Sequence, residues 1–280
     1  MRIGFIGAGR VGYTLGKFLK IHGTEVSGYY SRTNEHAKDA AAFTDTVYFE
    51  DTRELIKHSD AIILTVSDSA IPTVFNEIKN YPEIAEKIVC HTSGSVSSTV
   101  FGDSPFQVYG YSIHPIYAIS DKYASYKHFS NAFITIEGHE KYLAELEGIF
   151  CDAGIRTGTL RTEDKSKYHA SCVMASNLVC GIYGAAIQML ESCGFDFDTS
   201  NEMLIGLFRD NAMGIAEKGL VNQLTGPIDR NDVVTVRSHL STIPEEMKPL
   251  YIEASKYALE IAKKKNEDTD YSEMAELLSL

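Results

Sequence analysis

The sequence predicts an α/β fold in which a doubly wound parallel sheet is followed by an all-helical second domain. Up to about residue 160, short apolar runs alternate with amphipathic helical patterns, the order expected of a sheet covered by helices on both faces. Beyond Arg161 the strand patterns fade and long helical patterns replace them. We therefore expect two closely joined domains, residues 1–160 and residues 161–280.

The first unit reads as a strand, a tight turn and a helix. An apolar run over residues 2–6 leads into the pattern G-x-G-x-x-G, and an amphipathic segment over residues 13–21 follows. Gly7 permits the turn, Gly9 lets a pyrophosphate approach the backbone, and Gly12 lets the helix pack closely on the strand. This context predicts a Rossmann-type nucleotide-binding domain, with a purely structural glycine turn as the alternative. The predicted contact residues are Gly7, Ala8, Gly9, Arg10, Val11 and Gly12.

The end of the second predicted strand, residues 25–30, indicates which nucleotide binds. Proteins that bind NAD usually place an acidic residue there for the ribose hydroxyls, whereas this chain has Ser31, Arg32 and Thr33, with no carboxylate before Glu35. A guanidinium and two hydroxyls suit a 2′-phosphate, so the pattern favours NADP. A solvated turn and helix cap is a compatible alternative.

Further apolar runs and helical patterns complete both domains. Strands are expected over residues 61–66, 87–91, 107–112, 132–137 and 155–160, with a helix over residues 140–153. In the second domain helices are expected over residues 165–193, 200–218, 233–240 and 245–265, followed by a polar tail after Asn266.

Composition limits the kinds of partner. The net charge of −12 excludes a general basic surface for nucleic acid or an anionic membrane. The five cysteines form no C-x-x-C pair, which favours reduced thiols, and Met1 is followed at once by the first strand, without the pattern of a signal peptide. We expect a cytoplasmic protein.

One segment is long and apolar enough to span a bilayer. Residues 168–190 contain no Asp, Glu, Lys or Arg. They do contain His169, Asn177, Gln188 and several small residues that would let another helix approach closely. We therefore expect a helix that is buried within a helical domain or in a dimer, with a homodimer interface favoured, rather than a membrane span.

Polar segments follow three predicted strands, at the edge of the sheet where Rossmann ligands lie. Val66, Ser67 and Asp68 follow one strand, and Thr92 and Ser93 follow the next, so these segments are expected to flank the cofactor. His114 comes just before a proline near the end of the third. His114 and Ser93 are candidate catalytic residues, although Ser93 could instead bond to backbone groups and His114-Pro115 could mark a turn.

The long helix beyond residue 164 supplies three further candidates. Lys165, His169 and Asn177 recur at helical spacing and share one face, which could look into the cofactor cleft. Lys165 or His169 could protonate an alkoxide, while Asn177 could orient a carbonyl or carboxylate. The alternatives are a solvated lysine, a buried hydrogen-bonded histidine and a capping asparagine. No spacing of histidine and cysteine predicts a metal site.

The segment 224–232 has a structural and a functional interpretation. Asn231 or Asp232 could cap a helix that starts near Val233. Arg230 could instead anchor a substrate carboxylate through two hydrogen bonds.

These motifs together resemble a Rossmann-like family of NADP oxidoreductases whose C-terminal half is classed as a domain of unknown function. The resemblance rests on five motifs: residues 7–12, residues 91–94, the His114-Pro115 pair, residues 165–177 and residues 224–232. More distantly the chain is similar to ketopantoate reductases, pyrroline-5-carboxylate reductases and β-hydroxyacid dehydrogenases. In the last group a helix carries K-x-x-x-N, whereas here the fourth residue after Lys165 is His169.

The resemblance implies an NADPH-dependent reductase of a small carbonyl or imine compound, ketopantoate being one candidate, that works as a homodimer. The related dehydrogenases use a lysine on the equivalent helix, which favours Lys165 slightly as the proton donor, while histidine is the residue type that ordinarily exchanges protons near neutral pH, which keeps His169 as the alternative donor. A non-catalytic NADP(H)-binding sensor is the alternative, because a cofactor motif alone implies no chemistry.

Overall fold

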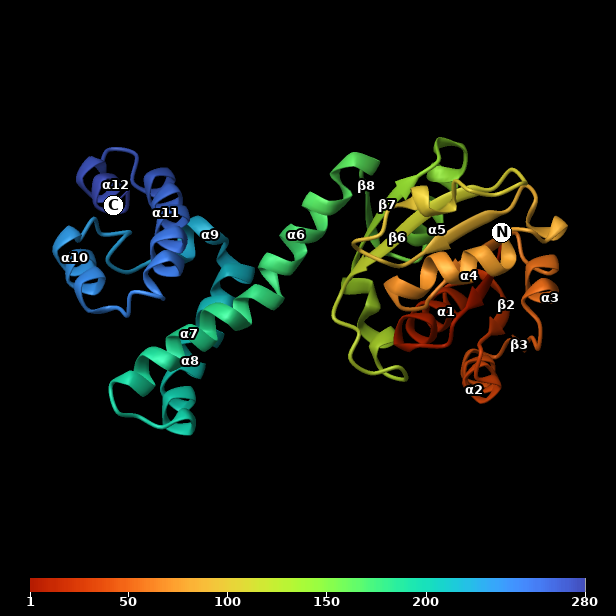
Figure 1. Ribbon diagram of the computed structural model, residues 1–280, viewed down its shortest axis with the longest axis horizontal. Coiled ribbons are helices and arrows are strands. Elements are labelled where there is room, and N and C mark those ends of the chain that lie inside the picture. The colour runs from red at the N-terminus through yellow and green to blue at the C-terminus, as the bar shows by residue number, and fades with distance from the viewer. Residues whose placement is uncertain (280) are drawn as a thin grey trace. The chain divides into compact units, whose positions relative to one another are not determined.

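The computed structural model describes residues 1–279 and divides the chain into two compact units, Met1–Cys172 and Val173–Leu280 (Figure 1). The division falls later than the expected boundary at residue 160. The reason is that the first turns of helix α6 (Lys165–Ala175) bond to the sheet of the first unit, through Lys165 and Tyr168.

The first unit is built on one eight-stranded sheet with the order β3-β2-β1-β4-β5-β6-β7-β8. The strands are β1 (Arg2–Ile6), β2 (Glu25–Tyr30), β3 (Val47–Tyr48), β4 (Ala61–Leu64), β5 (Ile88–His91), β6 (Tyr109–Ile116), β7 (Phe133–Gly138) and β8 (Arg156–Thr159). The predicted doubly wound α/β fold is thereby confirmed, and the short edge strand β3 is an addition to the predicted strands.

Two strands, β7 and β8, run against the other six. All neighbouring pairs are parallel except β6 and β7, which pair antiparallel with His114 opposite Thr135. The connection between them forms the 3-10 helix η4 (Ser125–Asn131), which packs on α1 and has no α-helix to carry the chain back across the sheet. The predicted parallel sheet therefore includes one antiparallel pair.

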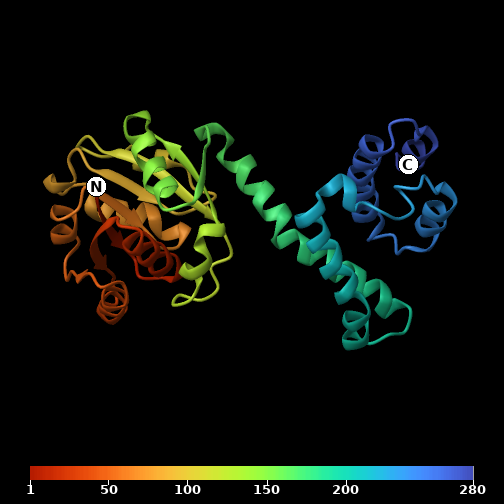
Figure 2. The ribbon, with the colours of Figure 1, turned by 180° about the vertical axis from the view of Figure 1, so that it is seen from behind.

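Helices cover both faces of the sheet (Figures 1 and 2). On one face α1 (Arg10–Ile21), α2 (Asn34–Thr44) and α5 (Leu143–Asp152) share a core with Phe5 and Ile63. On the other, α3 (Thr52–Lys57) and α4 (Ile71–Ile78) share a core with Ile62 and Leu64. Neighbouring residues of β4 thus face opposite cores, as the two-residue repeat of a strand requires. The remaining 3-10 helices are η1 (Asp68–Ala70), η2 (Pro82–Ile84), η3 (Ser98–Phe101), η5 (Glu140–Tyr142) and η6 (Thr162–Asp164).

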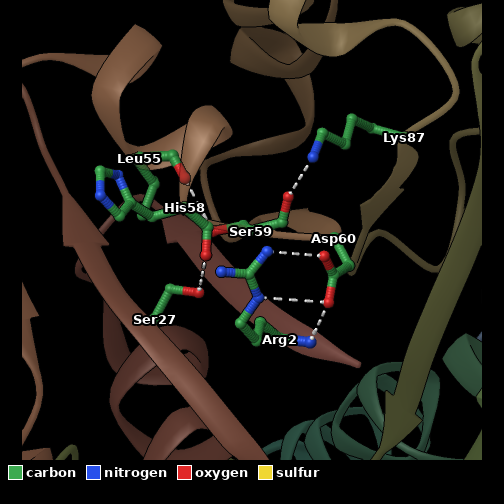
Figure 3. Close-up of polar contacts among 7 residues, drawn as sticks. All are labelled: Arg2, Ser27, Leu55, His58, Ser59, Asp60 and Lys87. Carbon is green, nitrogen blue, oxygen red and sulfur yellow. Dashed lines mark hydrogen bonds and ion pairs between the residues drawn. The ribbon is translucent and has the colours of Figure 1, made fainter.

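Polar bonds join the amino ends of the central strands to the turn before β4 (Figure 3). Asp60 accepts hydrogen bonds from the backbone N of Arg2 at 2.8 Å and from its guanidinium at 3.0 Å. Lys87 Nζ donates to the carbonyl of Ser59 at 2.7 Å, and Ser27 Oγ donates to the carbonyl of His58 at 2.9 Å. These bonds fix the amino edge of the sheet, opposite the edge at which the candidate site lies.

The second unit is all-helical over its described residues, as predicted. Its helices are α7 (Asn177–Ser192), α8 (Phe197–Lys218), α9 (Leu220–Gln223), α10 (Val233–Thr242), α11 (Lys248–Lys265) and α12 (Ser272–Leu277). The expected polar tail after Asn266 is wrong, because α12 buries Met274 and Leu277 in a core with Val236 and Leu259. Apolar residues spaced three apart were the available signal.

The predicted helix over residues 165–193 is interrupted at Ser176, where α6 ends and α7 begins. By length and composition, the helical run Thr162–Ser192 could cross a membrane. Its apolar side chains are largely uncovered in a single chain: Leu178 is 53% and Ile182 50% exposed. A single chain therefore does not bury this helix, and its burial in a dimer stays a prediction.

Candidate functional site

The glycine turn between β1 and α1 has the geometry its pattern predicts. Gly7 has φ 107°, a value that favours glycine, and its N–H donates to the carbonyl of Tyr30 at 2.8 Å. Its own carbonyl accepts a bond from Thr65 Oγ1 at 2.8 Å. A Cβ on Gly12 would lie 2.6 Å from Thr65 Oγ1 and 2.9 Å from the carbonyl oxygen of Gly7. Gly7 and Gly12 are therefore required by the turn and by close packing.

Gly9 differs from the other two glycines of the turn, Gly7 and Gly12. A Cβ there would lie 3.7 Å from the carbonyl oxygen of Thr65, an ordinary contact, so protein packing does not require glycine at this position. Gly9 is the N-cap of α1, with no side-chain capping bond, and the first turn of α1 has no acidic residue. Its N–H groups and the positive end of the helix dipole suit an anion, and the residues present fit a pyrophosphate.

The predicted 2′-phosphate segment follows β2 directly. Arg32 and Thr33 are exposed, and Ser31 is half-buried. Thr33 is the N-cap of α2 but makes no side-chain capping bond, so the capping alternative for its hydroxyl is not realised. The arrangement places one guanidinium and two hydroxyls at the carboxyl end of a strand next to β1.

The segments after β4 and β5 lie against each other. Val66 is half-buried while Ser67 and Asp68 are exposed, and Thr92 is half-buried. Ser95 Oγ donates to Asp68 Oδ2 at 2.8 Å, which joins the two segments. The predicted cofactor-flanking loops are thus brought together at one edge of the sheet.

Ser93 has a structural function within the loop after β5. Its N–H donates to Nδ1 of the buried His91 at 3.2 Å, and its Oγ accepts bonds from the backbone N of Ser95 at 3.1 Å and of Val96 at 3.0 Å. This is the backbone-bonding alternative noted for Ser93. The hydroxyl therefore shapes the loop that carries Gly94.

A buried carboxylate holds the far end of the same loop. Glu137 on β7 is 1% exposed and accepts bonds from Ser98 Oγ at 2.8 Å, Ser97 Oγ at 3.1 Å and the backbone N of Ser98. Glu137 cannot be recognised from the sequence, because an acidic residue in an otherwise apolar run gives no indication of its partner.

Lys165 is buried against the sheet rather than solvated. It is 3% exposed, and its Nζ donates to Ser112 Oγ at 2.5 Å. Ser112 Oγ in turn donates to the carbonyl of Ser93 at 3.0 Å. Burial lowers the pKa of Lys165, because its amine bonds to a neutral hydroxyl and the desolvation of the charged form is only partly offset. The solvated-lysine alternative is thereby excluded.

His114 and His169 face each other across Gly94. Their ring centroids are 6.3 Å apart, and a Cβ on Gly94 would lie 2.8 Å from His114 Nε2 and 2.6 Å from His169 Cδ2. His114 Nδ1 lies 2.6 Å from the hydroxyl of Tyr168, which also accepts a bond from Thr135 Oγ1 at 2.8 Å. Burial lowers the pKa of His114 to about 4, and the nearby Lys165 acts in the same direction.

The structure thus brings Lys165, His169, His114 and Ser93 together within the first unit. Ser112, Thr135 and Tyr168 also belong to this cluster and were not among the residues predicted for the site. Tyr168 was detectable, because it lies three residues after Lys165 and therefore on nearly the same helical face.

Two candidates, Asn177 and Arg230, belong to the second unit, whose placement against the first is not described. Asn177 begins α7, and its Oδ1 accepts a bond from Ser176 Oγ at 3.0 Å. Arg230 is exposed. Asp232 caps α10 by accepting a bond from the backbone N of Thr235 at 3.0 Å, so of the two predicted capping residues the cap is Asp232. Among residues 1–279, no group of three or more His, Cys, Asp or Glu side chains is placed to hold a metal ion.

Comparison with solved structures shows how widely this fold is shared. Protein TM1727 from Thermotoga maritima is 25% identical, with a TM-score of 0.74 over 94% of this chain and 99% of that one. A candidate NADP oxidoreductase from Bacteroides fragilis is 24% identical, with a TM-score of 0.64 over 92% and 98% of the two chains. The NADP-bound pyrroline carboxylate reductase of Plasmodium falciparum is 16% identical, with a TM-score of 0.57 over 95% and 98%. A search of curated proteins finds no match.

Two family models match the chain in succession. Residues 2–93 match the family described as NADP oxidoreductase, coenzyme F420-dependent, and residues 132–258 match the domain of unknown function DUF2520. The first description names the cofactor that the sequence predicts, NADP, and the second confirms the expected class of the C-terminal part. The chain is therefore similar to the NADP oxidoreductase family over residues 2–93 and to DUF2520 over residues 132–258, a range that begins at the end of the sheet and continues through most of the helical unit.

Proposed function

We propose that this protein is an NADPH-dependent reductase of a small carbonyl or imine compound. One observation carries the proposal: Lys165, His114 and His169 gather at the edge of the sheet that also carries the glycine turn. In doubly wound sheets ligands lie along this edge. The printed names of two structural neighbours, a pyrroline carboxylate reductase and an imine reductase, support a C=N or C=O substrate.

The residues of the glycine turn and of the segment after β2 would hold the cofactor. The uncapped N–H groups of α1 would bind the pyrophosphate, and Arg32, with the hydroxyls of Ser31 and Thr33, would bind the 2′-phosphate. When bound, NADPH supplies the hydride. Val66, Ser67, Asp68 and Thr92 would border the cofactor along the neighbouring strands.

Lys165 or His169 would supply the proton that the product oxygen or nitrogen receives. We favour Lys165, because burial lowers its pKa and so makes its ammonium a stronger acid. Ser112 holds the amine in place through a bond of 2.5 Å. Asn177 and Arg230 remain candidates for binding the substrate, Arg230 by holding a carboxylate, so a 2-keto acid such as ketopantoate is a candidate.

The test is loss of the absorbance of NADPH with a panel of 2-keto acids, other carbonyl compounds and cyclic imines. Replacing the true donor, by Lys165→Met or His169→Asn, should lower turnover by roughly 10²- to 10⁴-fold and leave NADPH affinity nearly unchanged. Lys87→Met is the matched control, because Lys87 also donates to a neutral oxygen but lies at the amino edge of the sheet (Figure 3). Tight NADPH binding with no turnover of any compound would overturn the reductase and favour the sensor.

We also propose that the protein is a cytoplasmic homodimer in which a second copy covers α7 and α8. Apolar side chains on these helices are exposed, among them Leu178, Ile182 and Leu207, the last at 70%. A Cβ on Gly181 or Gly184 would meet nothing within 4 Å, so both leave room for another helix. Light scattering at micromolar concentration tests the proposal: a monomer would refute it, and co-flotation with lipid vesicles would indicate a membrane instead.

A further inference from the structure

The bond between Tyr168 and His114 fixes which imidazole nitrogen carries a proton. Thr135 Oγ1 donates to the hydroxyl oxygen of Tyr168 at 2.8 Å, and its alternative acceptor, the carbonyl of His114, lies at 3.4 Å. The Tyr168 hydroxyl has one proton to donate, and His114 Nδ1 at 2.6 Å is a stronger acceptor for it than the sulfur of Cys172, which also interacts with this hydroxyl. A neutral imidazole that accepts at Nδ1 carries its proton at Nε2.

The other imidazole nitrogen of His114, Nε2, faces the space left by the missing side chain of Gly94. Nε2 is the atom that a Cβ on Gly94 would approach to 2.8 Å, and within residues 1–279 it has no hydrogen-bond partner. The side chain of His114 is half-buried, and the charged and titratable groups acting on it are Lys165, His169, Asp68 and His91. An N–H at this atom is therefore held by the protein and left without an acceptor of its own.

We propose that Tyr168 positions His114 as a neutral Nε2–H donor, and that this donor receives the carbonyl oxygen of the substrate. The inference rests on the proposed reductase function and narrows its substrate class. A carbonyl oxygen or neutral imine nitrogen can accept from an N–H, whereas a protonated iminium nitrogen is itself a donor and would oppose it.

His114 keeps its proton through the reaction. The carbonyl carbon gains the hydride, and the oxygen gains the proton given by Lys165 or His169 in the function proposed above. The Nε2–H bond strengthens as negative charge develops on the oxygen, which is the contribution of an oxyanion-type donor. Tyr168 acts through His114 and is a positioning residue.

Nitrogen NMR of the protein labelled with ¹⁵N-histidine near pH 7 tests the assignment without reference to activity. The His114 signals are identified by their loss in His114→Gln. We expect an unprotonated Nδ1 and a protonated Nε2 in the native protein, and a shift toward the Nδ1–H form in Tyr168→Phe. A native His114 with its proton on Nδ1 would overturn the proposal. Tyr123→Phe, which removes a hydroxyl bonded to Asp39, is the control and should leave the His114 signals unchanged.

Kinetics with a double-mutant cycle test the step from tautomer to substrate. Tyr168→Phe should lower kcat/KM for a carbonyl substrate about 10-fold, a partial loss of a donor of this kind. In the His114→Gln background the amide supplies a donor that needs no tyrosine, so the same change should have little further effect. Equal losses in both backgrounds would overturn the positioning role. If the native protein reduces no carbonyl or imine at all, the proposed function fails, and the NMR result alone still decides whether Tyr168 sets the tautomer.

Discussion

Acidification should destabilise the first unit through His91, the last residue of β5, which directly precedes the loop carrying Ser93 and Gly94. His91 is completely buried, and burial lowers its pKa from 6.5 to about 4, with Lys165 acting in the same direction. Between pH 6.5 and pH 4 the unfolded chain binds a proton at this residue and the folded chain does not. Stability therefore falls as the pH falls through this window. With these two pKa values the loss between pH 7 and pH 5 is about 2 kcal/mol.

His91→Asn isolates this contribution. Its amide oxygen can still accept the bond from the N–H of Ser93 but cannot titrate. Amide hydrogen exchange of β5, measured at pH 7 and pH 5, gives the opening free energy of this unit alone. We expect the native protein to lose about 2 kcal/mol more than the variant does, because the other histidines contribute equally to both proteins. Equal losses would show that His91 is not the titrating group and would refute the reasoning.

Three further predictions concern the site. Arg32→Ala should erase most of the preference for NADPH over NADH, on the order of 1–3 kcal/mol, and isothermal titration with both cofactors would measure it; equal affinities of the native protein would already contradict the assignment. If Lys165 is the proton donor, kcat/KM should fall as the pH rises, with an apparent pKa below the ordinary lysine value of 10.5, because the protonated form is the acid; a pH profile unchanged by Lys165→Met would exclude it. Gly94→Ala should lower kcat while sparing NADPH affinity, because the new Cβ would lie 2.8 Å from His114 Nε2, whereas Gly148→Ala, with nothing within 4 Å, should be silent; equal activity of the two variants would contradict the geometry.

The order of the elements could be predicted from the sequence, because hydrophobic periodicity is a local property. β2 spans the predicted residues 25–30, and most other predicted elements lie within a few residues of their observed bounds. The antiparallel pairing of β7 could not be predicted in this way. Periodicity shows that a strand exists but carries no information on its direction, which here depends on how residues 117–132 pack.

Residues of the site could be predicted only where they recur at a characteristic spacing along the sequence. The glycine turn and the shared face of Lys165 and His169 have such spacings. Ser112, Thr135 and Glu137 do not, because each is a polar residue within a strand whose function depends on a partner between 33 and 53 residues away in the sequence. Such pairs are created by the register of the sheet.

Strand β7 carries two polar residues whose separation is set by the rise of the strand per residue. Thr135 and Glu137 are two residues apart and project from the same side, while Ile134 and Ile136 project into the core on the other. Thr135 bonds to Tyr168 on α6, and Glu137 accepts bonds from the serines of the loop after β5. The points at which β7 holds Tyr168 and the loop after β5 are therefore separated by about 7 Å, the rise of two residues in a strand. A slip of a single residue in the pairing with β6 would turn both polar side chains toward the core and two isoleucines toward the site. An insertion or register shift in β7 therefore keeps both polar side chains on the site face only when it moves the strand by two residues.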